Sequence, residues 1–219
     1  MNYDKLLQEL IDENVKNNVV PSLILHSCCA PCSSFFIEYL ANYFYITILY
    51  YNPNISPIDE YLKRKDEQIR LIKSMKTKYE VKIMDCDYDN DLYEKVICGL
   101  ENEPEKGRRC TVCFNLRLDK TASICKNNNF DYFATTLTLS PYKNAKLINE
   151  IGFELGNKYN VKYLASDFKK RNGYKRSIEL SHKYNLYRQD YCGCKYSKKI
   201  KREVINEKAR EGEFLEVRW

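Results

Sequence analysis

Residues 44–51 read FYITILYY and are followed by the turn-forming segment Asn52-Pro53-Asn54. Aromatic and β-branched side chains favour strands, whereas Asn and Pro end them, so this stretch predicts a strand that stops at about residue 51. Upstream, the short apolar run Ser22–His26 predicts another strand, which ends where the first cysteines of the chain begin. Both predicted strands therefore lead directly into loops that carry polar or sulfur-containing side chains.

Outward from these two strands, the chain alternates between strand and helix patterns. Further strands are predicted at Val81–Met84, Tyr132–Thr138 and Val161–Ala165. Helical spacing of apolar residues predicts helices from Ile58 through Leu62, Ile69, Ile72 and Met75 to about Lys78, over Asp91–Leu100, over Cys110–Asn127, through Leu147–Leu155 after a cap-like Ser140-Pro141, and over Tyr174–Tyr184. The first of these helices is expected to start with an N-cap at Ser56, a proline at the first helical position, and a capping-box acid at Asp59.

Strands that alternate with helices are typical of βαβ units, and therefore of an α/β fold with a parallel sheet and helices on both faces. Ligands of such sheets bind outside the carboxyl ends of the strands. The cysteines after His26, the Asn52–Asn54 turn and Leu139–Tyr142 all follow predicted strands, so we expect them to share one site. The alternation continues without a linker or an internal repeat, which predicts a single domain.

The composition places the chain in a broad class. Of its 219 residues, 44% are hydrophobic, only 7 are Gly and 6 are Pro, and 10 are Cys. These values fit a globular protein rather than a disordered, fibrous or small disulfide-rich one. The segment 1–18 lacks an apolar signal core, and the uncharged stretches 19–37 and 40–58 read as strand plus turn, so no membrane span is expected. We therefore expect a cytoplasmic protein, in which clustered cysteines bind metals or act as thiols rather than forming disulfides.

Seven of the ten cysteines fall into three short motifs, which are Cys28-Cys29-Ala30-Pro31-Cys32, Cys110-Thr111-Val112-Cys113 and Cys192-Gly193-Cys194. On a helix, Cys110 and Cys113 share one face, which suits two ligands of one metal centre. Adjacent Cys28 and Cys29 are expected to point in different directions and to serve two neighbouring centres rather than one ion. Gly193 allows a sharp turn, so that its two flanking thiols can address one centre or two.

Seven thiols exceed what one tetrahedral zinc ion takes. A four-thiolate iron–sulfur cluster beside a second metal, which has three thiols and an open position, accounts for the count. Two alternatives stay open: structural zinc sites in a nucleic-acid-binding module, and a thioredoxin-like dithiol at Cys29 and Cys32 in a thiol–disulfide oxidoreductase. The remaining cysteines, Cys86, Cys98 and Cys125, are expected to be small buried apolar residues.

The net charge is +6, and basic residues gather in two runs close to cysteine motifs. These runs are Lys169, Lys170, Arg171, Lys175 and Arg176, and Lys195, Lys198, Lys199, Lys201 and Arg202. Their positions favour a polyanionic partner such as a nucleic acid. The sequence has neither a GxGxxG motif nor a Walker-A loop. His26 is expected to be a hydrogen-bonded residue beside the first cysteines, and His182 to have no chemical role.

Four segments, LILHSCCAPC, YYNPNI, RRCTVCFNLRL and QDYCGCKYS, occur in this order and resemble the cobalamin-independent epoxyqueuosine reductases, the QueH family. The similarity spans residues 22–197. It implies a Rossmann-like, HUP-type domain over residues 1–219, with a cysteine-bearing, cluster-binding and basic C-terminal extension from about residue 189. In that superfamily a Ser/Gly-rich loop after the first strand binds nucleotide phosphates, and here a cysteine-rich loop takes its place, which argues against the use of ATP.

The resemblance also implies an activity and its cofactors. Members of the family reduce the epoxide of epoxyqueuosine to queuosine at the wobble position of a tRNA anticodon. They carry a [4Fe–4S] cluster beside a second metal, here iron or zinc, and draw on a low-potential electron donor whose identity the sequence does not reveal. Mapped onto this chain, Cys29, Cys110, Cys113 and Cys192 would hold the cluster, and Cys28, Cys32 and Cys194 the second metal.

The implied reaction needs groups besides the metal ligands. A metal with an open position can act as a Lewis acid on the epoxide oxygen, and a proton donor must help water to leave. The candidate proton donors are Tyr51, Asp190 and Tyr191. Arg108 and Arg109 are expected to contact phosphate or to tune the cluster, and Asn52 and Asn54 to shape the pocket.

Overall fold

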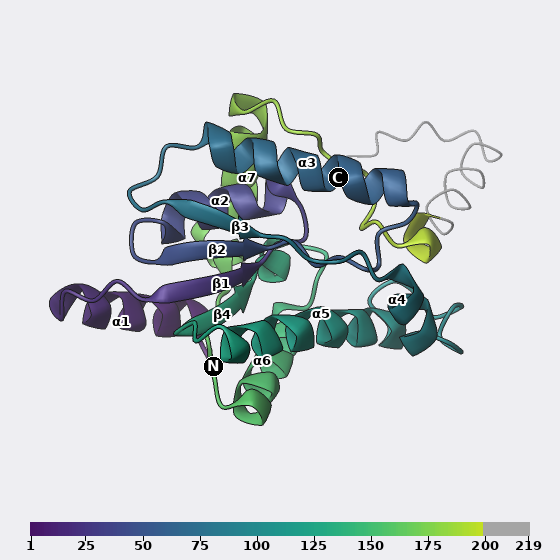
Figure 1. Cartoon of the computed structure of the whole chain (residues 1–219), viewed down its shortest axis with the longest axis horizontal. Helices are drawn as coiled ribbons and strands as arrows, with labels where there is room; N and C mark the ends of the chain where they lie inside the picture. The colour runs from purple at the N-terminus through teal and green to yellow at the C-terminus, as the bar shows by residue number, and fades with distance from the viewer. Residues whose placement is uncertain (199–219) are drawn as a thin grey trace.

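A five-stranded sheet with the order β3-β2-β1-β4-β5 forms the centre of the computed structural model, which describes residues 1–198 (Figure 1). The strands are β1 (Ser22–His26), β2 (Tyr45–Leu49), β3 (Val81–Met84), β4 (Tyr132–Thr135) and β5 (Lys162–Tyr163). All four strand pairings are parallel, and β1 lies in the middle between β2 and β4. The prediction of an α/β fold with a parallel sheet is confirmed.

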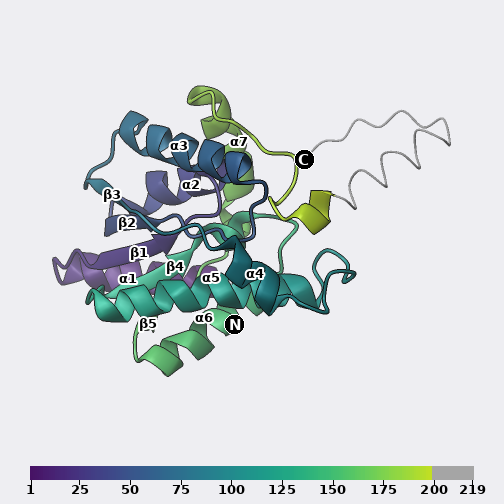
Figure 2. The ribbon, with the colours of Figure 1, turned by 45° about the vertical axis from the view of Figure 1, so that its right-hand side comes forward.

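Helices cover both faces of this sheet. They are α1 (Tyr3–Lys16), α2 (Ala30–Leu40), α3 (Ile58–Ser74), α4 (Asn90–Val96), α5 (Arg108–Asn127), α6 (Ala145–Tyr159) and α7 (Gly173–Lys183), with the 3₁₀ turns η1 (Thr136–Leu139) and η2 (Phe168–Arg171). Figures 1 and 2 show α2, α3 and α7 on one face, and α5 and α6 on the other. Among residues 1–198, no helix is both long and apolar enough to cross a membrane.

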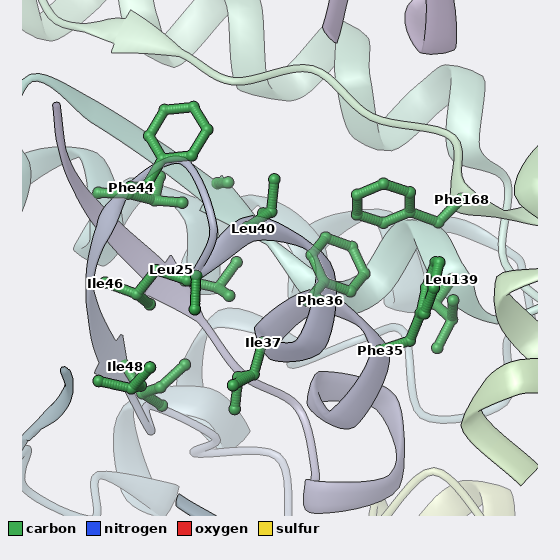
Figure 3. Close-up of a cluster of buried hydrophobic side chains, with 14 of the residues drawn as sticks. Leu25, Phe35, Phe36, Ile37, Leu40, Phe44, Ile46, Ile48, Leu139 and Phe168 are labelled. Carbon is green, nitrogen blue, oxygen red and sulfur yellow. The ribbon is translucent and has the colours of Figure 1, made fainter. Parts of the chain in front are cut away.

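The core is divided by the sheet into two parts. Leu23 and Leu25 of β1 point toward α2, whereas Ile24 points toward α5 and α6. On the α2 side, Phe36 packs edge-on against Phe168 with ring centroids 4.4 Å apart (Figure 3). Because β1 is buried on both faces, its sequence is a continuous apolar run rather than an alternating one.

Helix α2 was not predicted, because the stretch 19–37 reads as strand plus turn. The helix starts directly after Cys29, with Pro31 in its first turn, where a proline costs no helical hydrogen bond. Most of its residues are buried, including Ser33 and Ser34, so the helix lacks the polar face that normally reveals helical periodicity. The polar helix α1 was also missed; it buries only Leu7 and Ile11.

Several predicted helix starts are wrong. Helix α3 begins at Ile58 with Pro57 as its N-cap and without a side-chain cap, so Ser56 does not have that role. Helix α6 begins at Ala145 because the Asn144 side chain accepts a hydrogen bond from the Leu147 amide at 3.2 Å, so Ser140-Pro141 is not its cap.

The remaining segments mostly keep their predicted type but differ in extent. Strand β5 has only two residues, and β4 ends at Thr135, where η1 continues the chain. Helix α3 stops at Ser74, α4 spans Asn90–Val96, and α5 begins at Arg108. The buried face of α3 is also different from the predicted apolar stripe, because Ile58 and Leu62 are 50% and 46% exposed. That face instead consists of Tyr61, Arg64, Gln68 and Leu71.

Candidate metal centre

The first cysteine motif lies between the carboxyl end of β1 and the N-terminus of α2. The sulfur atoms of Cys28, Cys29 and Cys32 all lie within 4.8 Å of one another, and those of Cys28 and Cys29 are 3.8 Å apart. The expectation that the two adjacent thiols point in different directions is therefore wrong. The extended backbone of Cys29 and the immediate start of α2 bring all three sulfurs to a helix N-terminus, where negative charge is favoured.

Two neighbouring elements hold this motif in place. From η1, the Thr136 hydroxyl donates to Cys28 Sγ at 3.4 Å and accepts from the Cys28 amide at 3.1 Å. From α3, the side-chain oxygen of buried Gln68 accepts hydrogen bonds from the hydroxyls of Ser27 at 2.6 Å and Ser33 at 2.8 Å. The polar side chain of Gln68 on the inner face of α3 thus fixes the cysteine loop from both sides.

The second and third motifs meet each other. Cys110 and Cys113 lie in the first turns of α5, as their spacing predicts. Cys113 packs with Cys192 and Cys194 around Tyr93 of α4, whose hydroxyl donates to Cys194 Sγ at 3.3 Å. Figures 1 and 2 both place the start of α5, α4 and the yellow-green end of the described chain on the same side of the molecule.

Gly193 shapes the third motif through its backbone conformation. Its φ of +104° lies in a region that side chains disfavour, and a Cβ there would lie 2.7 Å from Ile55 Cγ1 and 3.1 Å from Arg64 Nη1. The Gly193 carbonyl accepts from the Ser56 amide at 2.9 Å, and Arg64 Nη2 donates to the Tyr191 carbonyl at 3.4 Å. The turn before α3 and the buried guanidinium of Arg64 therefore hold the Cys-Gly-Cys loop.

Gly193→Ala should lower the melting temperature and the metal uptake of the protein, because it combines backbone strain with a steric clash. Gly99→Ala is a matched control, since Gly99 also has a positive φ of +81° but no atom lies within 4 Å of its added Cβ. The control should lose only about 1 kcal/mol from strain, and Gly193→Ala clearly more. Thermal unfolding and metal analysis measure both effects, and equal losses in the two variants would contradict the close packing of Gly193.

The thiols carry unequal proton affinities. Hydrogen bonds from the Cys29 and Cys32 thiols hold the pKa of Cys28 well below its usual range, whereas the hydrogen bond with Cys28 helps to raise the pKa of Cys29 to about 12. In the third motif, the hydrogen bond from Cys194 likewise lowers the pKa of Cys192. The structure thus favours one thiolate in each of these two motifs, before any metal binds.

Two cations face these thiols. Arg117, on α5 one turn after Cys113, is 4% exposed. Lys143 lies in the loop between η1 and α6; burial lowers its pKa, but the nearby Cys28 and Cys32 outweigh this and raise it. Arg117 Nη1 donates to Asn52 Oδ1 at 3.3 Å, and Asn52 Nδ2 donates to the Ser27 carbonyl at 2.8 Å. The prediction that the turn after β2 lies next to the cysteines is therefore confirmed.

His26 is a structural member of this region. Its Nε2 donates to the Tyr51 carbonyl at 3.1 Å, so its Nδ1 accepts from the Thr135 hydroxyl at 2.8 Å. Complete burial, together with the charge of Arg117, lowers its pKa to about 3. The ring is neutral near pH 7 and offers no proton of an imidazolium. His182 is exposed on α7, away from the predicted strand-end site.

The predicted proton donors occupy different surroundings. The half-buried Tyr191 donates its hydroxyl to the Ser56 carbonyl at 3.2 Å, and its ring lies against Arg64 at 5.0 Å. Tyr51 is 3% exposed in the core beside α5. Asp190 precedes Tyr191 in the loop that leads to the third cysteine motif. Of these side chains, Tyr191 lies next to a predicted metal ligand in the sequence, and its role stays a prediction.

The basic residues are less available to a nucleic acid than their sequence suggests. Arg171 is ion-paired with Asp4, and Arg176 with Glu38 at 2.8 Å, so two of the five residues of the first run tie η2 and α7 to α1 and α2. Arg109 is 1% exposed and donates to the Glu101 carbonyl at 2.8 Å, so the expectation that it contacts phosphate is wrong. In the second run, Lys195 pairs with Glu94 at 2.9 Å, and Lys199, Lys201 and Arg202 lie outside the described residues.

The other predicted residues differ in their exposure. Arg108 is 78% exposed and pairs with Glu103 at 2.7 Å, and Asn54 is buried with an unpartnered side-chain oxygen among the described residues. Cys125 is buried as expected, Cys86 is only half-buried, and Cys98 is exposed, which contradicts the expectation for it. Cys98 follows α4 in a surface turn. A single cysteine in the sequence does not indicate whether its side chain is exposed.

Sequence reasoning missed the polar residues that surround the thiols. These are Arg64, Gln68, Tyr93, Arg117, Thr136 and Lys143. Arg117 could have been found from its place four residues after Cys113, which puts it on the same helix face. Thr136 could have been found from its position near the carboxyl end of the predicted strand Tyr132–Thr138. The others are brought to the site only by the tertiary fold.

Comparison with known proteins identifies the family to which this fold and these cysteines belong. The family model described as epoxyqueuosine reductase QueH matches residues 23–200. The chain is 45% identical over 202 residues to the epoxyqueuosine reductase QueH of Streptococcus pyogenes serotype M1, covering 91% of this chain and 79% of that protein. It is 46% identical over 201 residues to the Staphylococcus epidermidis protein, covering 90% and 84%, and 42% identical over 223 residues to that of Staphylococcus aureus, covering 99% and 92%. The resemblance predicted from four short motifs is thus confirmed, and the chain belongs to the epoxyqueuosine reductase QueH family.

Proposed function

We propose that this protein is an epoxyqueuosine reductase, which converts epoxyqueuosine to queuosine at the wobble position of a tRNA anticodon in the cytoplasm. The observation that carries the proposal is a group of three cysteine sulfurs within 4.8 Å of one another at the carboxyl end of β1, in a chain of the QueH family. That position is where ligands of parallel α/β sheets bind. A reductase of this kind needs a buried redox centre, and the site offers buried thiols for one.

We further propose that the seven cysteines of the three motifs hold a [4Fe–4S] cluster and an adjacent iron or zinc ion. Thiolates are the ligands that suit iron–sulfur clusters and zinc, and the facing cations Arg117 and Lys143 suit an anionic metal–thiolate group. The proposed cluster ligands are Cys29, Cys110, Cys113 and Cys192, and the proposed ligands of the second metal are Cys28, Cys32 and Cys194. The Cys28 and Cys29 sulfurs are 3.8 Å apart, yet the proposal assigns them to different metal centres. Serine variants of these two residues are therefore the sharpest test of how the ligands divide between the two centres.

The overall reaction sets what the protein has to supply. Two C–O bonds of the epoxide break, one C=C bond forms, two electrons and two protons are taken up, and water is released. When bound, the metal centre would transfer single electrons and polarise the epoxide oxygen. The electrons come from an external low-potential donor, and the centre must therefore lie within reach of both the donor and the tRNA.

The residues of the chain would position these groups and deliver protons. Thr136 and Tyr93 hold Cys28 and Cys194 by hydroxyl-to-sulfur hydrogen bonds. Lys143 faces Cys28 and Cys32 as a protonated ammonium, which favours negative charge on the departing oxygen. Tyr191 remains the candidate proton donor, next to Cys192 of the third motif. We propose Cys28, Cys32, Cys194 and Tyr191 as the residues at the reacting atoms.

Anaerobic incubation tests this function. The purified protein, reconstituted with iron and sulfide, is mixed with epoxyqueuosine-bearing tRNA and a chemical reductant, and the nucleosides are analysed. We expect a brown protein with several irons per chain that produces queuosine. A colourless protein that contains stoichiometric zinc and forms no queuosine would favour a zinc-bound nucleic-acid-binding module. A metal-free protein that cycles a disulfide between Cys29 and Cys32 would favour a thiol–disulfide oxidoreductase.

Binding of tRNA should weaken steeply between 50 and 200 mM salt, because contacts with phosphates release counterions. Both arginines of the first basic run, Arg171 and Arg176, are already ion-paired, so the salt dependence should be less steep for their glutamine variants only if these pairs open on binding. Filter binding at a series of salt concentrations measures the slope. A flat salt dependence would argue against a polynucleotide substrate.

A further inference from the structure

Arg117 is a buried cation whose charge has no acidic partner in the described chain. Its side chain is 4% exposed. Nε donates to the Cys113 carbonyl at 3.3 Å and Nη1 donates to Asn52 Oδ1 at 3.3 Å, and both acceptors are neutral. Within residues 1–198, none of the ion pairs to a carboxylate involves Arg117. A guanidinium buried in this way is costly unless an anion faces it.

The groups that do face Arg117 are thiols. Burial lowers the pKa of Arg117, but Cys113, Cys28 and Cys192, one cysteine from each of the three motifs, outweigh this and raise it. The other buried arginines of the described region differ in this respect. Arg64 forms an ion pair with Glu60 at 2.7 Å, and Arg109 donates hydrogen bonds through Nη1 to carbonyls of the turn before α5. Cys29 also raises the pKa of Arg64, but less than its partner Glu60 does, whereas a cysteine from each of the three motifs raises the pKa of Arg117.

We propose that Arg117 is the built-in counter-charge of the metal–thiolate centre, favouring its assembly and making it easier to reduce. This inference rests on the proposed function, because it assumes that a redox-active metal centre occupies the thiols. Thiolate ligands give such a centre negative charge, and each added electron increases it. A fixed positive charge in a poorly solvated interior stabilises the reduced form more than the oxidised form.

The anchoring of Arg117 agrees with this role. The side-chain oxygen of Asn52 accepts a hydrogen bond from the guanidinium, and the side-chain amide of Asn52 donates one to the Ser27 carbonyl at 2.8 Å. The charge is thereby held between α5 and the loop that carries Cys28, and it needs no rearrangement when the centre gains an electron. Groups beyond the ligands that are held in this way tune both metal affinity and reduction potential. Arg117 is therefore a positioning and tuning residue rather than a catalytic one.

Three variants of the anaerobically reconstituted full-length protein test the inference. Arg117→Gln removes the charge, Arg117→Lys keeps it, and Arg176→Gln removes one positive charge from the surface of α7, where the arginine pairs with Glu38 and Glu179. Spectroelectrochemical titration measures the midpoint potential of each protein. We expect a more negative potential for Arg117→Gln, and potentials close to the wild-type value for the other two. A fully loaded Arg117→Gln protein with an unchanged potential would overturn the inference.

Binding of Cd²⁺ to the reduced apoprotein provides a second measurement that needs no iron–sulfur cluster. The ultraviolet cadmium–thiolate absorption gives the affinity, which should fall by about 10- to 100-fold in Arg117→Gln and stay near the wild-type value in Arg117→Lys. This measurement decides the matter if Arg117→Gln fails to take up iron. Equal affinities in both variants would overturn the counter-charge role. If the wild-type protein takes up no iron at all, the proposed cofactor is wrong, whereas the cadmium result still decides the role of Arg117 toward the thiolates.

Discussion

Cys113→Ser should reduce queuosine formation by roughly 10³-fold or more, with a matching loss of iron from the protein. Replacing a group next to the metal ligands typically lowers affinity or activity 10- to 100-fold, so the loss of a ligand itself should have a larger effect. The serine hydroxyl is a hard and protonated group that replaces a soft thiolate poorly. Cys113 is 7% exposed and packs with Cys194 and Tyr93, so its sulfur lies within the convergence of the second and third motifs.

Cys125→Ser is the matched control, because Cys125 lies on the same helix and is completely buried. Its thiol donates to the Phe130 carbonyl at 3.3 Å, a hydrogen bond that a hydroxyl can keep. The control should retain iron and activity. Nucleoside analysis after anaerobic turnover gives the activity, and chemical iron analysis gives the loading. A Cys113→Ser protein with wild-type activity would remove this thiol from the proposed ligand set.

Phe36→Ala should destabilise the metal-free protein by about 3–5 kcal/mol, because it opens a cavity in the larger core. Phe36 is fully buried in α2, and its ring packs against Phe168 as Figure 3 shows. Urea unfolding in the presence of a thiol reductant measures the change as a shift in midpoint with a constant slope. The metal-free form is used because bound metal adds its own contribution to the apparent stability.

Leu62→Ala is the control for this experiment. Leu62 was predicted to lie on the buried stripe of α3, but it is 46% exposed, so its truncation should change stability by only about 0.5 kcal/mol. The pair of variants therefore compares a buried side chain on a helix that the sequence did not predict with an exposed one on a helix that it did predict. Similar losses in both would mean that the core on the α2 side is not packed as described.

The sequence alone was sufficient to predict patterns that repeat along the chain and motifs that consist of a rare residue type. The strands β1 and β2 follow from their apolar and β-branched runs, and the parallel sheet follows from the alternation with helices. The three cysteine motifs were visible because cysteine pairs at short spacing are rare. The first motif lies at the carboxyl end of β1, as the general position of sites in α/β folds predicts.

The rest depends on contacts between distant residues. Helix α2 is buried so completely that it shows no polar periodicity, and the buried face of α3 carries Arg64 and Gln68, which look like surface residues in the sequence. In the same way, Arg171 and Arg176 looked like an RNA-binding run, although they pair with Asp4 and Glu38. A single polar residue gives no sign of its partner until the chain is folded.

The three cysteine motifs come from the beginning, the middle and the end of the described chain. A ribosome that synthesises the protein must therefore extend the chain past Cys194 before the last of these thiols can join the first. Metal bound by the proposed ligands would tie distant segments together, much as a cross-link does, and would restrict the unfolded chain most strongly where the enclosed loops are longest. Loading of the proposed centre should accordingly follow the synthesis of all three motifs, and the nascent chain must keep its early thiols reduced and free until then.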